Sequence, residues 1–439
     1  MKKTFLNLTL LLAAFAPCAF AQNGDENAYE PRDMAECHPR GGIPNFLKKC
    51  ERGDQGLKIA YLGGSITAQH GWRPQSLQLF RKLFPKAQID EIHAAIGGTG
   101  SDFGVCRLKK DVLEGNPDLV FIEFAVNDGG RAPVEIRKNI EGIIRQIWAQ
   151  DKNTDICFVY TLTNGMEKQI INTGKMTRAA SVMEELADYY SIPSINFGKR
   201  VAELAGEGKI DMKSSEPVVK GKAADPSMNT RAAVDKNGKI PFAKDGVHPD
   251  AATGHVLYTE AIERSLPAIF AASKENSKPR SVPPAKRADC IEKVGTIMID
   301  ELPQTKGFAR APFGNSAWGR FVKLAPGQEF EFKFKGARAI ACVRFGTDGG
   351  IMELTLDGKT TEVKCFDRHC SWNRRTIIVL GDNLEDKVHT VKIRASGKKF
   401  DKRSILTDEH KAKYDLDPSK FDDNYVYISA VFFLENQAK

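Results

Sequence analysis

The chain has 439 residues, of which 41% are hydrophobic and 27% charged, and its formal net charge is +8 at neutral pH. This length is sufficient for about two to three domains with a sizeable core. The lysines are scattered rather than arranged in a stripe, which argues against a nucleic-acid-binding surface. Beyond the N-terminal region no apolar run approaches the ~18 residues of a membrane-spanning helix, so we expect no integral membrane segment in the mature protein.

The first 21 residues have the features of a secretory signal. Two lysines are followed by an apolar run from Phe5 to Phe15 and by the small-x-small site Ala19-Phe20-Ala21. A lipoprotein site at Cys18 fits badly because a proline precedes it. We therefore expect residues 1–21 to be removed, the mature chain to begin near Gln22, and the protein to be periplasmic or extracellular.

Eight cysteines remain after the signal, an even number that permits disulfides in an exported protein. Cys37 and Cys50 are close in sequence, as are Cys365 and Cys370, but closeness does not fix the pairing. None has the CxxC spacing of a metal site. We expect disulfides or buried thiols, and no metal or cofactor.

After an N-terminal segment at residues 22–56, a predicted α/β domain covers residues 57–272. Short apolar runs that resemble strands buried on both faces alternate there with stretches of helical spacing. The expected strands are Lys58–Leu62, Ile89–Ile96, Leu119–Val126, Ile156–Leu162 and Ile192–Phe197. The expected helices are Gln75–Leu83, Pro133–Ala149 and Met176–Tyr190, with a final helix from about Ala251. This alternation predicts a parallel sheet with helices on both faces and ligands at the carboxyl ends of its strands.

The remaining segments are of three kinds. Lys209–Lys244 is polar and Lys-rich, as expected of a lid or a decorative insertion. Ser273–Lys286 is rich in proline and charge and reads as a linker. Residues 287–439 alternate with period two, which predicts an all-β sandwich or jelly roll. Its expected strands are Glu329–Lys335, Ala339–Phe345, Met352–Leu356, Thr376–Leu380, Thr390–Ala395 and Tyr425–Phe433.

Two glycine-rich turns follow the first two predicted strands. Gly63-Gly64-Ser65 can expose the serine hydroxyl at a strand end, although such a sequence is more often only a turn. Gly97-Gly98-Thr99-Gly100 lets backbone N–H groups approach an anion. A dinucleotide site is disfavoured because the glycine spacing is one residue too long and the segment follows the wrong strand. A contribution to an oxyanion hole is the better interpretation.

Two polar pairs complete the set. Asn127-Asp128 ends the third predicted strand, where a simple turn is an equal alternative. Asp245 and His248 lie three residues apart before the final helix, so the carboxylate can hydrogen-bond one imidazole nitrogen while the other nitrogen faces a serine. A helix-capping aspartate beside an unrelated histidine would look the same. Each feature is weak alone, but together they occur in order at strand ends.

At these residues the chain resembles the SGNH/GDSL hydrolase family. The resemblance covers roughly residues 57–272 and implies a flavodoxin-like sheet. The family's four signature residues match Ser65, Gly98, Asn127 and His248, with Asp245 as the triad acid. The sequence departs from the family pattern in having Gly64 where an acidic residue usually precedes the nucleophile. It also has Ala125 where a glycine usually stands two residues before the asparagine.

The resemblance implies a serine esterase in which His248 activates Ser65 and Asp245 orients the imidazole. The Ser65 and Gly98 N–H groups and the Asn127 amide would form the oxyanion hole. The resemblance implies that the substrate is an O-acyl ester, with O-acetyl favoured, of a polysaccharide or oligosaccharide. A lipase, lysophospholipase or thioesterase with the same triad is the alternative enzyme, and a glycan-binding protein with an inactive esterase fold is the alternative from another class.

Several residues have less certain roles. His70 and Trp72 follow the nucleophile turn and are candidate pocket residues, with ordinary surface or packing roles equally open. His255 is expected to face the core. Glu123 and Asp128 are expected to be structural supports. Trp318 and Trp372 of the β-domain suit sugar stacking or burial, and we favour burial.

Overall fold

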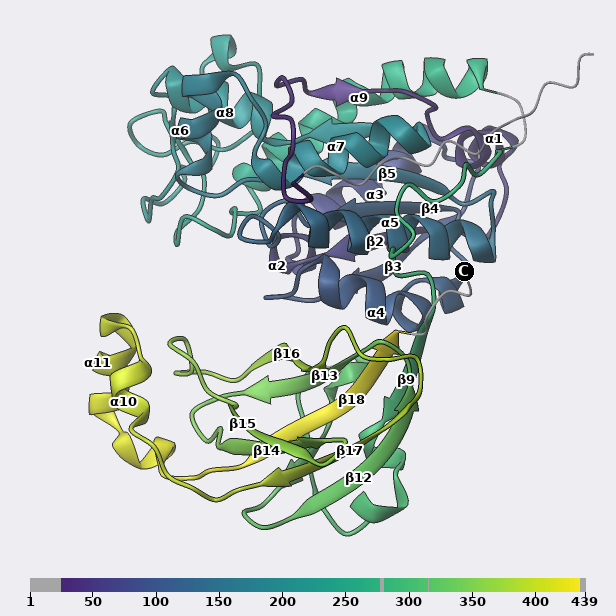
Figure 1. Cartoon of the computed structure of the whole chain (residues 1–439). Coiled ribbons are helices and arrows are strands. Elements are labelled where there is room, and N and C mark those ends of the chain that lie inside the picture. Colours follow the sequence, from purple (N-terminus) through teal and green to yellow (C-terminus); the bar gives the residue numbers. More distant parts are fainter. Residues whose placement is uncertain (1–24, 277–279, 315, 435–439) are drawn as a thin grey trace, which may run out of the picture.

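The computed structural model describes residues 25–276, 280–314 and 316–434. An N-terminal α/β domain packs against a C-terminal β-domain (Figure 1). The expected secretory signal at residues 1–21 lies outside the described residues. Within the described part, no helix is both long enough and apolar enough to cross a membrane.

The α/β domain is built on a six-stranded sheet with the strand order β1-β6-β5-β4-β2-β3. Strands β2 to β6 are mutually parallel, and β1 is antiparallel to β6. The order of the five parallel strands is flavodoxin-like, as expected. The strands are β1 Cys37–His38, β2 Leu57–Gly63, β3 Ile89–Ala95, β4 Leu119–Glu123, β5 Asp155–Tyr160 and β6 Ser194–Asn196.

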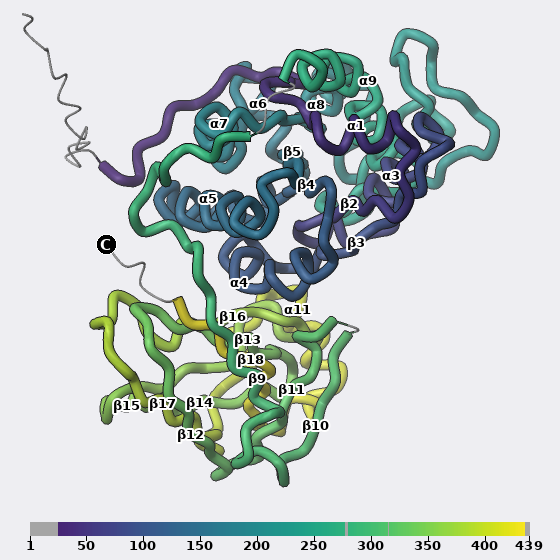
Figure 2. The backbone as a smooth tube through the Cα atoms, turned by 90° about the vertical axis from the view of Figure 1, so that its right-hand side faces the viewer, coloured from purple at the N-terminus to yellow at the C-terminus, as the bar shows by residue number. Residues whose placement is uncertain are grey.

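Helices cover both faces of this sheet (Figure 2). On one face lie α4 (Ser101–Asp111), α5 (Pro133–Gln150) and α7 (Arg178–Tyr190), which share an apolar core. On the other face lie α1 (Pro44–Arg52), α3 (Trp72–Leu83), α8 (Gly198–Gly206) and α9 (Gly254–Glu275). The short helices α2 (Ser65–Ala68) and α6 (Met166–Thr173) follow strand ends. The central strands β4 and β5 are buried along their whole length, which explains their continuous apolar sequences.

The N-terminal segment is part of this domain rather than a separate tail. Its strand β1 extends the sheet beyond β6, and its helix α1 contributes Phe46 to the core shared with α9. Periodicity alone did not indicate β1 because two residues are too few to show a pattern.

The Lys209–Lys244 segment is largely irregular. Two short parallel strands, β7 (Ile210–Asp211) and β8 (Ile240–Pro241), close its base. Most residues between them are exposed.

The segment expected to be a linker packs against the α/β domain. Helix α9 extends to Glu275, and Arg280 then donates a 2.7 Å hydrogen bond to the buried Asp155 carboxylate. The Arg280 guanidinium also lies 4.8 Å from the Trp148 ring. The hydroxyl of Tyr189 donates to the Pro284 carbonyl at 3.0 Å. These contacts hold the connection against the α/β domain.

The β-domain is a sandwich of two antiparallel sheets. One has the order β10-β11-β18-β13-β16, with β9 also paired to β18, and the other has the order β12-β17-β14-β15. The sheets enclose one apolar core, and β12 alternates buried phenylalanines with exposed charges. The strands are β9 Val294–Met298, β10 Ala309–Pro312, β11 Arg320–Leu324, β12 Glu329–Lys335, β13 Arg338–Phe345, β14 Ile351–Leu356, β15 Lys359–Lys364, β16 Arg374–Gly381, β17 Val388–Ala395 and β18 Val426–Leu434.

Two short helices, α10 (Lys402–Ile405) and α11 (Asp408–Leu416), lie at one end of the sandwich (Figure 1). The sequence patterns did not indicate them. All six strands expected from period-two alternation are present, with ends shifted by at most two residues.

The cysteines are thiols rather than disulfides across most of the described chain. Cys37, Cys50, Cys106, Cys157, Cys342, Cys365 and Cys370 are free, and all but Cys37 are buried. Burial raises the pKa of Cys50 and Cys370 to about 12, so these sulfurs behave as small apolar groups. Of the two outcomes expected for the cysteines, buried thiols describe six of these seven, and Cys37 is a partly exposed thiol.

Trp318 joins the two domains. Its side chain is 1% exposed and packs against Phe103 of α4 and Phe432 of β18, with ring centroids 6.4 and 4.9 Å away. Its indole N–H donates a 2.8 Å hydrogen bond to Asp111 at the end of α4. Burial of Trp318 agrees with the sequence-based preference. Trp372, for which burial was also favoured, is 47% exposed, so that prediction is wrong.

The buried position of Trp318 predicts a large effect on stability. Trp318→Ala should lower the free energy of unfolding by about 3–5 kcal/mol, because it removes a large buried ring and leaves a cavity between the domains. Chemical denaturation followed by circular dichroism measures this change. Trp372→Ala is the matched control and should change stability by less than about 0.5 kcal/mol, since its ring is half-exposed. Equal effects of the two substitutions would contradict the conclusion that Trp318 is buried between the domains and stabilises the fold.

Candidate active site

The nucleophile turn lies at the carboxyl end of β2. Ser65 begins helix α2, and Gly64 before it is extended, with φ −91° and ψ −153°. Gly64 has a steric role, because a Cβ at this position would lie 2.0 Å from Asn127 Oδ1. The absence of the family's usual acidic residue therefore coincides with close packing of the Asn127 side chain against the turn.

A continuous hydrogen-bond chain links Ser65, His248 and Asp245. The Ser65 hydroxyl lies 2.8 Å from His248 Nε2, and His248 Nδ1 lies 2.7 Å from Asp245 Oδ2. These distances suit a hydroxyl that donates to Nε2 and an Nδ1–H that donates to the carboxylate. The structure thus brings together three side chains from two segments that are far apart in sequence.

Asp245 is held as an anion. Partial burial acts to raise the pKa of Asp245, but hydrogen bonds from the His248 backbone N–H and imidazole, together with the Val247 N–H, lower it to about 2. Both backbone N–H groups lie 2.8 Å from Asp245 Oδ1. The two carboxylate oxygens therefore have different partners. Oδ1 accepts hydrogen bonds from the backbone of the loop at residues 245–248, and Oδ2 contacts the imidazole.

The segments that carry the three expected oxyanion donors lie next to one another at the Ser65 turn. Ser65 is the first residue of α2, where backbone N–H groups lack helical partners. A Cβ added to Gly97 would lie 3.5 Å from Ser65 Cβ, which places the Gly97–Gly98 turn beside the nucleophile. Gly98 has φ +72°, a left-handed conformation that favours glycine. Asn127 follows β4 and lies against Gly64.

This arrangement depends on the strand order. Strand β2 lies between β3 and β4 in the sheet, so the chain passes to opposite sides of β2 in its first two crossovers. The loops after β2, β3 and β4 meet at this switch point, which is where open α/β sheets bind ligands.

The buried side chain of Glu123 contacts the turn that carries Ser65. Glu123, the last residue of β4, is completely buried and accepts hydrogen bonds from the hydroxyls of Thr67 and Thr161 at 3.0 and 2.7 Å. Burial raises the pKa of Glu123, although the threonine hydroxyls and the Gly64 backbone N–H act to lower it. The roles of Thr67 and Thr161 were missed from the sequence. The polar Glu123 at the end of an apolar strand was the available signal.

The two candidate pocket residues lie in different environments. His70 is exposed. Trp72 is completely buried and packs edge-on against Tyr61, Phe121 and Phe197. Its ring belongs to the core beneath the sheet, which does not fit a role in lining a substrate pocket.

His255 faces the core, as expected. Its side chain is 1% exposed, and burial lowers its pKa to about 3. Its ring packs so closely on Gly71 that a Cβ there would lie 2.1 Å from a ring carbon. His255 therefore stays neutral and serves packing.

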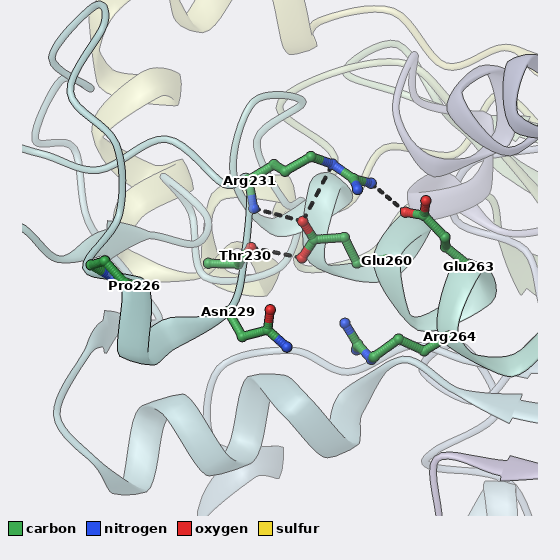
Figure 3. A pocket seen from close by; sticks show the side chains of 7 residues that line it. All are labelled: Pro226, Asn229, Thr230, Arg231, Glu260, Glu263 and Arg264. Carbon is green, nitrogen blue, oxygen red and sulfur yellow. Dashed lines mark hydrogen bonds and ion pairs between the residues drawn. The ribbon is translucent and has the colours of Figure 1, made fainter.

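A separate surface pocket of about 500 Å³ lies between α9 and residues 226–231, in the middle of the Lys209–Lys244 segment (Figure 3). Its charged groups are already paired, since Arg231 binds Glu263 at 2.6 Å and Glu260 accepts from Thr230 at 2.7 Å. Arg264 in turn binds Glu36. Ser65, Gly98, Asn127, Asp245 and His248 do not line it. Its lining residues are Pro226, Asn229, Thr230, Arg231, Glu260, Glu263 and Arg264.

The chemistry available at Ser65 is nucleophilic attack assisted by an oriented imidazole. Among the described residues, no group of three or more His, Cys, Asp or Glu side chains is arranged to hold a metal ion.

The close contact between Gly64 and Asn127 predicts the outcome of a substitution. Gly64→Ala should displace the Asn127 amide and slow labelling of Ser65 by a fluorophosphonate by at least about tenfold, because loss of an oxyanion donor typically costs about 10²–10³ in rate. Gly130→Ala is the matched control, since a Cβ there meets no atom within 4 Å. Labelling rates measured by mass spectrometry test this, and an unchanged rate for Gly64→Ala would refute it.

Comparisons with known proteins agree with this geometry. Residues 61–253 match the model of the GDSL-like lipase/acylhydrolase family. The chain also resembles two solved structures of a two-domain esterase active on acetylated mannans, each with a TM-score of 0.65. It is 19% identical to the structure co-crystallised with mannopentaose, over 91% of this chain and 97% of that chain.

The second structure is 20% identical over 91% of this chain and 98% of that chain. At these identities the likeness concerns the fold. A search of curated protein sequences found no match. The chain therefore carries, at residues 61–253, a domain of the GDSL-like lipase/acylhydrolase family, which is followed by a C-terminal all-β domain.

Proposed function

We propose that the protein is an exported serine esterase that removes O-acetyl groups from a polysaccharide or oligosaccharide. The observation that carries this proposal is the hydrogen-bond chain from Ser65 through His248 to Asp245 at the switch point of the sheet. The triad assignment rests on these contacts, and export rests on the sequence of residues 1–21.

In the proposed mechanism, His248 Nε2 takes the Ser65 hydroxyl proton as the oxygen attacks the ester carbonyl carbon. Asp245 stabilises the imidazolium that forms. The Ser65 and Gly98 N–H groups and the Asn127 amide receive the negative oxygen. The imidazolium then protonates the departing alcohol. A water molecule, deprotonated by the same histidine, releases acetate and restores Ser65.

Two features support a polymeric substrate. A cavity of about 610 Å³ between the domains is lined by Gly97 beside the nucleophile, His93 at the end of β3 and Arg375 of the β-domain. Such a space suits an extended polar molecule because charged and polar side chains contribute to its walls. The fold also resembles that of an esterase active on acetylated mannans. Acetylated mannan is therefore the first polymer to test.

Ser65 is the residue to test first. Ser65→Ala should lower the rate of acetate release from a small acetyl ester and from acetylated mannan by at least about 10⁴, because the nucleophile is lost. Ser404→Ala, at an exposed serine of the β-domain, should leave both rates unchanged. Acetate is quantified enzymatically. A wild-type protein that hydrolyses octanoyl esters far faster than acetyl esters would favour a lipase instead.

Asp245 should act as an anion throughout the working pH range. Because its pKa is lowered to about 2, its carboxylate stabilises the fold fully above the unfolded-state pKa of about 3.9, and this effect is lost progressively as the pH falls from that value to about 2. The acidic limb of the kcat profile should therefore not reflect Asp245. Asp245→Asn should reduce kcat by about 10⁴, since the imidazole loses its orienting partner. Steady-state kinetics from pH 4 to 9 measure both effects. A kcat of Asp245→Asn within tenfold of the wild-type value would contradict the role of Asp245 in orienting the His248 imidazole.

A further inference from the structure

Asp128 connects two loops that approach Ser65. It directly follows Asn127, and its side chain is completely buried. Its Oδ1 atom accepts hydrogen bonds from the Ser101 backbone N–H and from Arg131 Nε, both at 3.0 Å. Ser101 is the first residue of α4 and lies three residues after Gly98. One carboxylate oxygen thus ties the loop that carries Gly98 to the loop that carries Asn127.

The loop that carries Gly98 and the loop that carries Asn127 are packed tightly together at Gly100 and Asp128. A Cβ at Gly100 would lie 2.3 Å from Asp128 Oδ1, so the carboxylate presses directly on the backbone between Gly98 and Ser101. On the far side, the Asn139 amide donates to the Ser101 hydroxyl at 3.2 Å. Ser101 is therefore held from two directions.

Arg131 balances the charge of Asp128. Its guanidinium bridges Asp128 and Asp102, and its side chain is one-third exposed. A lone carboxylate near a developing oxyanion would repel it. The adjacent guanidinium offsets this repulsion.

Burial raises the pKa of Asp128 to about 6, although its contacts with Ser101 and Arg131 act to lower it. Burial of the ionised carboxylate therefore costs free energy of folding.

We propose that Asp128 is a positioning residue that sets the spacing between the Gly98 N–H and the Asn127 amide, the two oxyanion donors that come from different strands. This inference rests on the proposed function, because the spacing matters only if both groups bind the oxyanion. Asp128 acts through these two donors and touches no reacting atom.

Asp128→Asn preserves the size of the side chain but removes the charge that holds Arg131. We expect kcat on a small acetyl ester to fall by about 10- to 100-fold with KM changed less than threefold, because a displacement of about 1 Å can cost about 10² in rate. Fluorophosphonate labelling of Ser65 should slow in parallel, since the phosphonyl oxygen occupies the same hole. A purely structural role would lower thermal stability and leave both rates unchanged.

Asp155→Asn is the matched control. Asp155 is also completely buried, and it also accepts from one backbone N–H, that of Phe46 at 2.8 Å, and one arginine, Arg280 at 2.7 Å. It lies at the opposite, amino-terminal end of its strand. Asp155→Asn should lower the melting temperature without lowering kcat. An equal loss of kcat in both variants would overturn the proposal.

Gly100→Ala tests the same contact from the other loop and covers the case in which Asp128→Asn fails to fold. Its φ of −101° is accessible to alanine, so the substitution acts through the contact with Asp128. The double variant should lose less kcat than the product of the two single losses, because both disturb one contact. Multiplicative losses would overturn the coupling.

The failure of this inference is distinguishable from failure of the proposed function. If Ser65→Ala abolishes esterase activity while Asp128→Asn and Gly100→Ala keep wild-type kcat, the esterase assignment stands and the positioning role is refuted. If the wild type has no Ser65-dependent esterase activity, both are refuted.

Discussion

The hydrogen bond between the Ser65 hydroxyl and His248 Nε2 joins two ends of the α/β domain that are 183 residues apart in sequence. Ser65 depends on β2 and its tight turn, whereas His248 depends on the loop before α9. Neither segment places its side chain correctly unless the whole sheet and its covering helices have formed. The contact therefore requires the turn after β2 and the loop before α9 to be in place at the same time.

Buried carboxylates recur around this contact. Glu123 binds Thr67 in the turn of Ser65 and Thr161 just after β5, and Asp128 holds the two loops that flank Ser65. Apolar side chains would be cheaper to bury. Carboxylates bind several N–H and O–H groups with fixed geometry, which suits loops that have no regular secondary structure of their own. The buried carboxyl groups of Glu123 and Asp128 thus make the site rigid, although burying them is energetically unfavourable.

Much of the fold was predictable because buried parallel strands are continuously apolar and sandwich strands alternate. Ser65, Asp245 and His248 were predictable as a set because their order along the chain is informative where each alone is not. For Trp72 the sequence left a pocket role and a packing role equally open, because closeness in sequence to Ser65 does not determine the face of a helix. The tie between Asp128 and Ser101 was not predictable, since it depends on the distance between loops that follow different strands.

The packed junction between the domains has a consequence for modular evolution and engineering. Trp318 of the β-domain packs between α4 and β18, and residues 280–286 pack along the α/β domain. Removal of the β-sandwich would expose an apolar surface on α4, so the α/β domain is not an independent folding unit. A graft of this β-domain onto another esterase would succeed only where the recipient offers a complementary aromatic surface on the equivalent helix.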